Sequence, residues 1–160
     1  MGIRDVMGYA IGFILFIVLI PALMWWASGQ VAFAVGKMIC FALFAAAGVA
    51  LSIWSIVYMK IAGKGNPLDA FNHEIAPRTS NLMTDGPYRI CRNPMLLGVF
   101  IYYIGVLIYL HTWQALVIFA IYVLIMMGQV HKEEKRLEQD FGEEYRAYKK
   151  RTKKLIPFVW

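Results

Sequence analysis

Long stretches without charge constrain this sequence more than any other feature. Residues 6–26 contain no charged side chain, and residues 31–59 contain only one, Lys37. A helix rises about 1.5 Å per residue, so each stretch is long enough to cross a bilayer core of roughly 30 Å. The chain is 60% hydrophobic and 16% charged, whereas soluble domains are roughly 45–50% apolar and 25% charged. The sequence therefore predicts an all-α integral membrane protein.

Two more apolar stretches, residues 94–110 and 113–130, are separated only by His111 and Thr112, which predicts a tight helical hairpin. With the first two, they make four transmembrane helices in a single domain, 1–160. Residues 6–26 also resemble a signal peptide, but their length and the small number of basic residues before them favour a permanent span.

Basic residues predict the orientation of the chain. The loop 60–93 and the tail 131–160 hold nearly all of the 16 Lys and Arg residues, and basic loops stay in the cytoplasm. We therefore expect both termini, and any active site built from these polar segments, to be cytoplasmic, at the inner membrane if the source is bacterial. The net charge of +6 then reflects topology and contact with anionic lipid rather than nucleic-acid binding.

The tail carries an amphipathic pattern. Leu137, Phe141, Tyr145 and Tyr148 recur at helical spacing, which predicts a C-terminal amphipathic helix on the cytoplasmic side. Such a helix can anchor the tail on lipid or cover a site as a lid.

Several functions are disfavoured by missing residues. The predicted spans hold one ionisable group, Lys37, so a pump or channel has little to use. His73, His111 and His131 are isolated, and no His-Glu-x-x-His or Cys-x-x-Cys pattern occurs, so no metal site is predicted.

Two polar segments remain as candidates for a site. Arg92 lies in a turn that opens the third span, where a helix N-terminus favours anions. Glu133 and Glu134 follow the fourth span, where two adjacent acids favour a cationic partner. Because a short hairpin joins these spans, we expect Arg92 and Glu133 to lie side by side and to bind a zwitterion such as an amino acid group. The simpler alternatives are headgroup anchoring by the turn, and pairing of the two acids with Lys132, Lys135 and Arg136.

The second half of the chain contains a series of motifs in a fixed order: Gly86-Pro87-Tyr88, Arg92-Asn93-Pro94-x-x-x-Gly98, Glu133-Glu134-x-x-Leu137, Phe141-Gly142-Glu143-Glu144-Tyr145-x-x-Tyr148 and Ile156-Pro157-Phe158. With them it resembles the isoprenylcysteine carboxyl methyltransferase and phosphatidylethanolamine methyltransferase superfamily of membrane enzymes. The resemblance implies S-adenosylmethionine as cofactor. It also implies a set of cofactor-binding residues: Leu82, Met83, Tyr88, Arg92, Asn93, Pro94, Met95, Leu96, Gly98, Glu133 and Glu134.

Three positions depart from the family pattern. Asn93 replaces the usual His and Leu96 the usual Tyr, and Gln129 stands where the methyl-ester enzymes carry an Arg near the substrate carboxylate. The resemblance makes Arg92 and Gln129 the candidates for positioning the substrate. It also implies a lipid or lipophilic acceptor that enters from the bilayer, with an isoprenylcysteine-type carboxylate as the first expectation and a phospholipid amine as the alternative. An NADPH-dependent lipid reductase and a non-catalytic membrane adaptor are the alternatives from other classes.

Overall fold

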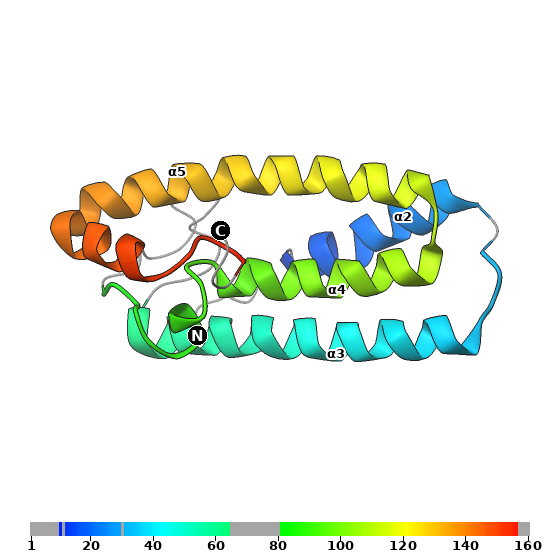
Figure 1. The fold of residues 1–160 in the computed structure, drawn as a ribbon, viewed down its shortest axis with the longest axis horizontal. Coiled ribbons are helices and arrows are strands. Elements are labelled where there is room, and N and C mark those ends of the chain that lie inside the picture. Colours follow the sequence, from blue (N-terminus) through cyan, green and yellow to red (C-terminus); the bar gives the residue numbers. More distant parts are fainter. Residues whose placement is uncertain (1–9, 11, 30, 65–80, 157–160) are drawn as a thin grey trace.

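The computed structural model describes residues 10, 12–29, 31–64 and 81–156, and every regular element in these ranges is a helix. Three long helices run side by side along the molecule, and the N-terminal helix lies beside the last two (Figure 1). In chain order the elements are η1 (Ile14–Leu19), α2 (Ile20–Ser28), α3 (Val35–Tyr58), η2 (Met59–Gly63), η4 (Gly86–Arg89), α4 (Pro94–Leu110) and α5 (Trp113–Arg151).

Local sequence explains the ends of α4. Pro94 is the first residue of the helix, where the missing N–H costs nothing and the fixed φ suits a helix. His111 ends the helix in the left-handed conformation, with φ 50°. The predicted range 94–110 and the predicted start of the next helix at residue 113 are both confirmed.

The predicted ranges of the first two helices need correction. The second helix begins at Val35 rather than residue 31, after an extended Ala34, and its π-helical end continues to Gly63 instead of stopping at residue 59. The first helix ends at Ser28 rather than residue 26. Residues 6–9 and 11 of its predicted range lie outside the described residues, as do residues 65–80 of the predicted loop.

α3 and α4 approach closely because two glycines face each other. A Cβ on Gly98 would lie 2.6 Å from the Gly48 carbonyl oxygen, and one on Gly48 would lie 2.7 Å from the Tyr102 nitrogen. The hydroxyl of Ser52 donates a hydrogen bond of 3.1 Å to the Met95 carbonyl in the same contact. This contact fixes the start of α4 against α3.

The π-helix η1 is tied to α4 by two tyrosines. The Tyr103 hydroxyl donates to the Phe16 carbonyl at 2.7 Å, and the Tyr102 hydroxyl donates to the Ile17 carbonyl at 3.2 Å. The Phe16 ring packs against Tyr122 of α5 at 5.9 Å between centroids. The two hydrogen bonds therefore hold Phe16 against α5.

We expect Tyr103→Phe to lower the free energy of unfolding by about 1 kcal/mol, because the hydrogen bond between the buried Tyr103 and the Phe16 carbonyl is lost. Tyr109→Phe is the matched control, since its hydroxyl has no hydrogen bond within the described part of the chain. Thermal unfolding in detergent measures the difference. Equal losses of stability in the two variants would contradict the assigned role of the Tyr103 hydroxyl.

α5 is not one straight helix. Gly142 has φ 51° and ψ −122°, and the chain reverses there, so that the last turns of α5 run back toward the start of α4 (Figure 1). The prediction that Leu137, Phe141, Tyr145 and Tyr148 share one continuous helical stripe is therefore wrong. The four side chains still meet, because they pack in one cluster from the two sides of the bend.

Two helices, Val35–Gly63 and Trp113–Arg151, are long and apolar enough to cross a membrane, and Ile14–Ser28 and Pro94–Leu110 are shorter apolar helices. Only 11% and 17% of the apolar windows of the two long helices are buried, whereas the core helix of a soluble protein would be mostly buried. Large apolar side chains such as Trp26, Ile61 and Leu124 are exposed on the outside. This outward-facing apolar surface suits lipid rather than water.

Candidate functional site

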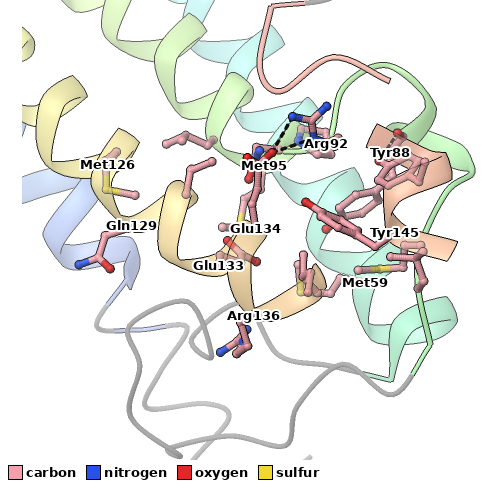
Figure 2. Close-up of a pocket in the computed structure, with 18 of the residues that line it drawn as sticks. Met59, Tyr88, Arg92, Met95, Met126, Gln129, Glu133, Glu134, Arg136 and Tyr145 are labelled. Carbon is pink, nitrogen blue, oxygen red and sulfur yellow. Dashed lines mark hydrogen bonds and ion pairs between the residues drawn. The ribbon is translucent and has the colours of Figure 1, made fainter. Parts of the chain in front are cut away.

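A cavity of about 1100 Å³, counting its open mouth, lies between the start of α4, the middle of α5 and the segment before α4. Met126 and Gln129 lie at one end, Met59, Tyr88 and Tyr145 at the other, and Glu133 between them (Figure 2). The structure thus brings together in one pocket the following sequence-predicted residues: Leu82, Met83, Tyr88, Arg92, Asn93, Pro94, Met95, Leu96, Gln129, Glu133 and Glu134.

Gly98 is the one predicted site residue that the structure places elsewhere. It is on the side of α4 that faces α3, where only a residue without a side chain fits against Ser52 and Gly48. Gly98 therefore packs two helices together and does not line the pocket.

Local backbone geometry places Tyr88 in the pocket. Gly86 begins the short turn η4 with φ 59°, in the left-handed region, and a Cβ there would lie 2.6 Å from the Tyr58 ring. The Tyr88 ring then packs on Tyr58 at 6.2 Å between centroids. Glycine at this position allows the turn to lie directly on α3.

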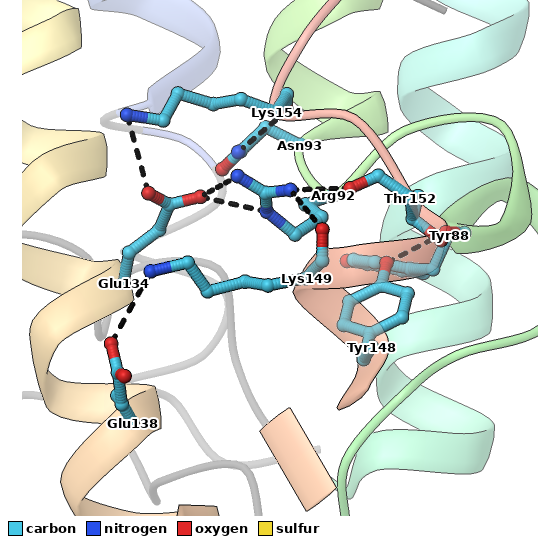
Figure 3. Close-up of polar contacts among 9 residues, drawn as sticks. All are labelled: Tyr88, Arg92, Asn93, Glu134, Glu138, Tyr148, Lys149, Thr152 and Lys154. Atoms are coloured by element: carbon cyan, nitrogen blue, oxygen red, sulfur yellow. Dashed lines mark hydrogen bonds and ion pairs between the residues drawn. The ribbon is translucent and has the colours of Figure 1, made fainter. Parts of the chain in front are cut away.

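Arg92 and Glu133 line the same pocket, as the sequence predicts, and Arg92 forms an ion pair with the neighbouring acid, Glu134. Its Nε donates to Glu134 Oε1 at 2.8 Å, its second terminal nitrogen lies 2.7 Å from the same oxygen, and both side chains are less than 10% exposed. The other terminal nitrogen donates to the carbonyls of Lys149 and Thr152 (Figure 3). Lys154 Nζ contacts the second Glu134 oxygen at 3.2 Å. Arg92 and Glu134 thus neutralise each other within the protein.

More hydrogen bonds join the turn before α4 to the C-terminal tail. Asn93 Nδ2 donates to the Lys154 carbonyl at 2.9 Å, and the Arg92 backbone N–H donates to the Lys153 carbonyl at 2.8 Å. The Tyr148 hydroxyl donates to the Tyr88 carbonyl at 2.6 Å. The tail therefore folds back against the turn before α4 as far as Lys154. Pro157 and Phe158 of the Ile156-Pro157-Phe158 motif lie outside the described residues.

The phenols of the pocket are held in their neutral form. Burial, and then the negative charge of Glu133, raise the pKa of Tyr88. Burial also raises the pKa of Tyr145 and Tyr148. At neutral pH these side chains can donate hydrogen bonds but add no charge to the pocket.

Burial raises the pKa of the Cys91 thiol from 9.0 to about 11. Between these values the unfolded thiol loses its proton while the folded thiol keeps it, so the unfolded state is favoured as the pH rises. We expect the melting temperature to fall more steeply between about pH 9 and 11 in the parent than in Cys91→Ala. Because both proteins contain the same tyrosines, the difference in slope reports Cys91. Parallel curves would contradict the shift.

For several pocket residues, nothing in the neighbouring sequence indicates that they line a site. Phe16, Met59, Tyr122 and Met126 come from η1, η2 and α5, and they reach the pocket through tertiary packing alone. Arg136 also lines the pocket, three residues after Glu133 and thus on the same face of α5. That spacing is the one sequence feature that could have identified it.

Three comparisons define the class of the protein. The sequence model of a family described as phospholipid methyltransferase matches residues 36–144, and the chain belongs to this family. The predicted superfamily is thereby confirmed. The outward-facing apolar helices agree with it, and the chain is a membrane protein.

The curated relatives share a common name. The chain is 36% identical over 93 residues to protein-S-isoprenylcysteine O-methyltransferase of Mus musculus, an alignment that covers 56% of this chain and 33% of that protein. It is 32% identical over 94 residues to protein-S-isoprenylcysteine O-methyltransferase B of Arabidopsis thaliana, covering 56% and 48%. For the Schizosaccharomyces pombe protein of the first name the identity is 26% over 106 residues, covering 64% and 45%. The chain thus spans about a third to a half of the length of these relatives. No solved structure matches it.

Proposed function

We propose that this chain transfers a methyl group from S-adenosylmethionine to a lipophilic acceptor. The observation that carries the proposal is a single pocket in which Glu133 and Arg136 adjoin apolar and aromatic walls, between helices whose outer faces are apolar. Family membership and the names of the relatives support it.

The pocket residues suit the parts of this cofactor. Its amino acid end is a zwitterion, and Glu133 and Arg136 offer one charge of each sign from the same face of α5. Its adenine ring is flat and mostly apolar, and Leu82, Met83 and Tyr88, which pack in one cluster, supply an apolar and aromatic surface of the pocket. We assign the ammonium group to Glu133 and the carboxylate to Arg136.

When bound, S-adenosylmethionine supplies a methyl group on a positively charged sulfur, and the bond to sulfur breaks with its electron pair as an acceptor atom takes the methyl. The protein then has to orient two reactants and exclude water. The apolar side chains of Met95, Leu96 and Met126 line the pocket and suit that task. A carboxylate acceptor needs no base, so neither Glu133 nor a tyrosine has to move a proton.

The acceptor is assigned from the relatives and from the pocket. The name isoprenylcysteine O-methyltransferase leads us to propose an isoprenylcysteine-type carboxylate. Gln129 and Met126 lie together at the end of the pocket away from Tyr88 (Figure 2), and we place the acceptor there. A phospholipid amine is the second candidate, favoured by the neutral charge of Gln129 at this end.

We further propose a membrane arrangement with four spans. The two long and two shorter apolar helices are the spans, and the pocket opens on the cytoplasmic side, where the basic residues of the tail lie. The bent end of α5 then rests at the membrane surface over the pocket.

The test is methyl transfer by the purified full chain. The protein is incubated with radiolabelled S-adenosylmethionine and either an S-farnesylcysteine derivative or phosphatidylethanolamine vesicles. We expect label in an acceptor, and base treatment distinguishes the two: a methyl ester releases volatile methanol, whereas an N-methyl amine keeps its label. Absence of label with these and with total lipid extract, from protein that unfolds cooperatively, would contradict the proposal and favour the adaptor. Binding of NADPH instead of S-adenosylmethionine would favour the reductase.

A further inference from the structure

The segment that follows the bend at Gly142 covers one side of the pocket. This C-terminal roof, residues 143–155, runs back from the bend at Gly142 and contributes Tyr145 and Tyr148 to the pocket wall. Leu155 is 4% exposed and packs in the main hydrophobic core. The roof thus closes one side of the pocket and is attached at its far end.

The bonds that hold the roof come from residues expected to hold the cofactor. The N–H groups of Arg92 donate hydrogen bonds to Glu134 and to two roof carbonyls, those of Lys149 and Thr152. Asn93 donates its amide hydrogen to a third roof carbonyl, that of Lys154 (Figure 3). A guanidinium has five N–H groups, so these contacts account for most of its donors.

Glu134 completes the attachment. One of its oxygens takes both Arg92 contacts, and the other contacts Lys154 of the roof at 3.2 Å. The Glu134 side chain is only 8% exposed, and a buried acid of this kind has to be paired. Glu134 therefore joins the turn before α4 to the end of the roof.

We propose that Arg92, Asn93 and Glu134 are positioning residues that fasten the C-terminal roof, and that binding the charged end of the cofactor falls to Glu133 and Arg136. The assignment of the cofactor rests on the proposed function, but the fastening of the roof does not. The two adjacent acids thereby have different roles: Glu133 binds the ligand, and Glu134 holds the roof in place.

Cys91 reports whether the roof is closed. Its side chain is completely buried beside Arg92, and it lies close enough to Tyr148 of the roof to affect the pKa of that phenol. Burial also raises the pKa of its thiol to about 11, which lowers the small thiolate fraction present at neutral pH, and the thiolate is the form that reacts with maleimides. Cys40, the other thiol, is exposed, so the experiment uses the full chain carrying Cys40→Ser.

The experiment compares Glu134→Gln with Glu133→Gln in this background. We expect Glu134→Gln to accelerate maleimide labelling of Cys91 at least about tenfold, because Arg92 is left buried without its counter-charge. Glu133→Gln should label at the parent rate but bind S-adenosylhomocysteine about tenfold more weakly. Lys154→Gln, a milder change at the edge of the site, should accelerate labelling less than Glu134→Gln.

The effect of ligand on the labelling rate shows whether Glu134→Gln opens the roof or unfolds the protein as a whole. Saturating S-adenosylhomocysteine should slow the labelling of Glu134→Gln back toward the parent rate, since a ligand covered by the roof favours the closed state. The same variant should show a raised KM for the methyl donor with kcat nearly unchanged.

The outcomes are distinct. Parent-like labelling of both Glu134→Gln and Lys154→Gln, or faster labelling of Glu133→Gln than of Glu134→Gln, would overturn the assignment of the roof. Faster labelling of Glu134→Gln in a protein that binds no S-adenosylhomocysteine would support the roof and overturn the proposed function.

Discussion

Glu133→Ala is expected to weaken the binding of S-adenosylhomocysteine about 10- to 100-fold, the loss typical of a hydrogen bond to a charged group. Glu133 lies in the middle of the pocket, between the Gln129 end and the Tyr88 end (Figure 2). It raises the pKa of the buried Tyr88, so its charge is felt within the pocket. Removing it takes away the partner that we assign to the ammonium group of the ligand.

The matched control is Glu143→Ala. Its side chain is 84% exposed and pairs at the surface with Arg146, so the variant removes the same charge without touching the pocket. Calorimetric titration of both variants and the parent gives the dissociation constants. Unchanged affinity in Glu133→Ala, or equal losses in both variants, would contradict the role given to Glu133.

Gly98→Val is expected to lower the free energy of unfolding by about 3 kcal/mol or more, at the upper end of the cost of overpacking. The added side chain would meet the backbone of Gly48 and Ser52, which cannot rotate away as a flexible side chain can. Separation of α3 and α4 would also shift the start of α4, where Met95 and Leu96 line the pocket. We therefore expect ligand affinity to fall together with stability.

Gly128→Val is the control for this substitution. Gly128 lies in α5, and apart from its chain neighbours and the adjoining turns of its own helix backbone no atom lies within 4 Å of a Cβ built on it. Thermal unfolding in detergent should give a melting temperature near that of the parent for Gly128→Val and a much lower one for Gly98→Val. Similar melting temperatures for both variants would show that the two helices do not depend on the contact at Gly98.

The sequence predicts a helix end correctly where a residue at that end determines it. Pro94 and the break at His111 and Thr112 define α4 and the start of α5 within the sequence itself. The bend of α5 is different, because a glycine inside a helical pattern does not reveal its φ, and Gly142 adopts 51°. The periodicity of residues 137–148 therefore predicts one face where the structure has two segments.

In the site, too, some features follow from the local sequence and others only from the folded structure. Motif order identifies Tyr88, Asn93 and Glu133 as neighbours of the pocket, and the structure places all three in its lining. The partner of Arg92 is decided by which acid of an adjacent pair points toward the returning tail, and that depends on the bend at Gly142. Phe16 and Tyr122 reach the pocket only through packing of η1 on α5.

Calorimetric titration of the purified full chain with S-adenosylmethionine and S-adenosylhomocysteine tests the central claim most directly. NADPH serves as the comparison ligand, and cooperative thermal unfolding shows that the protein is folded. We predict saturable binding of both sulfur compounds at one site per chain and none of NADPH. Folded protein that binds neither compound would contradict the assignment of this pocket to a methyl donor.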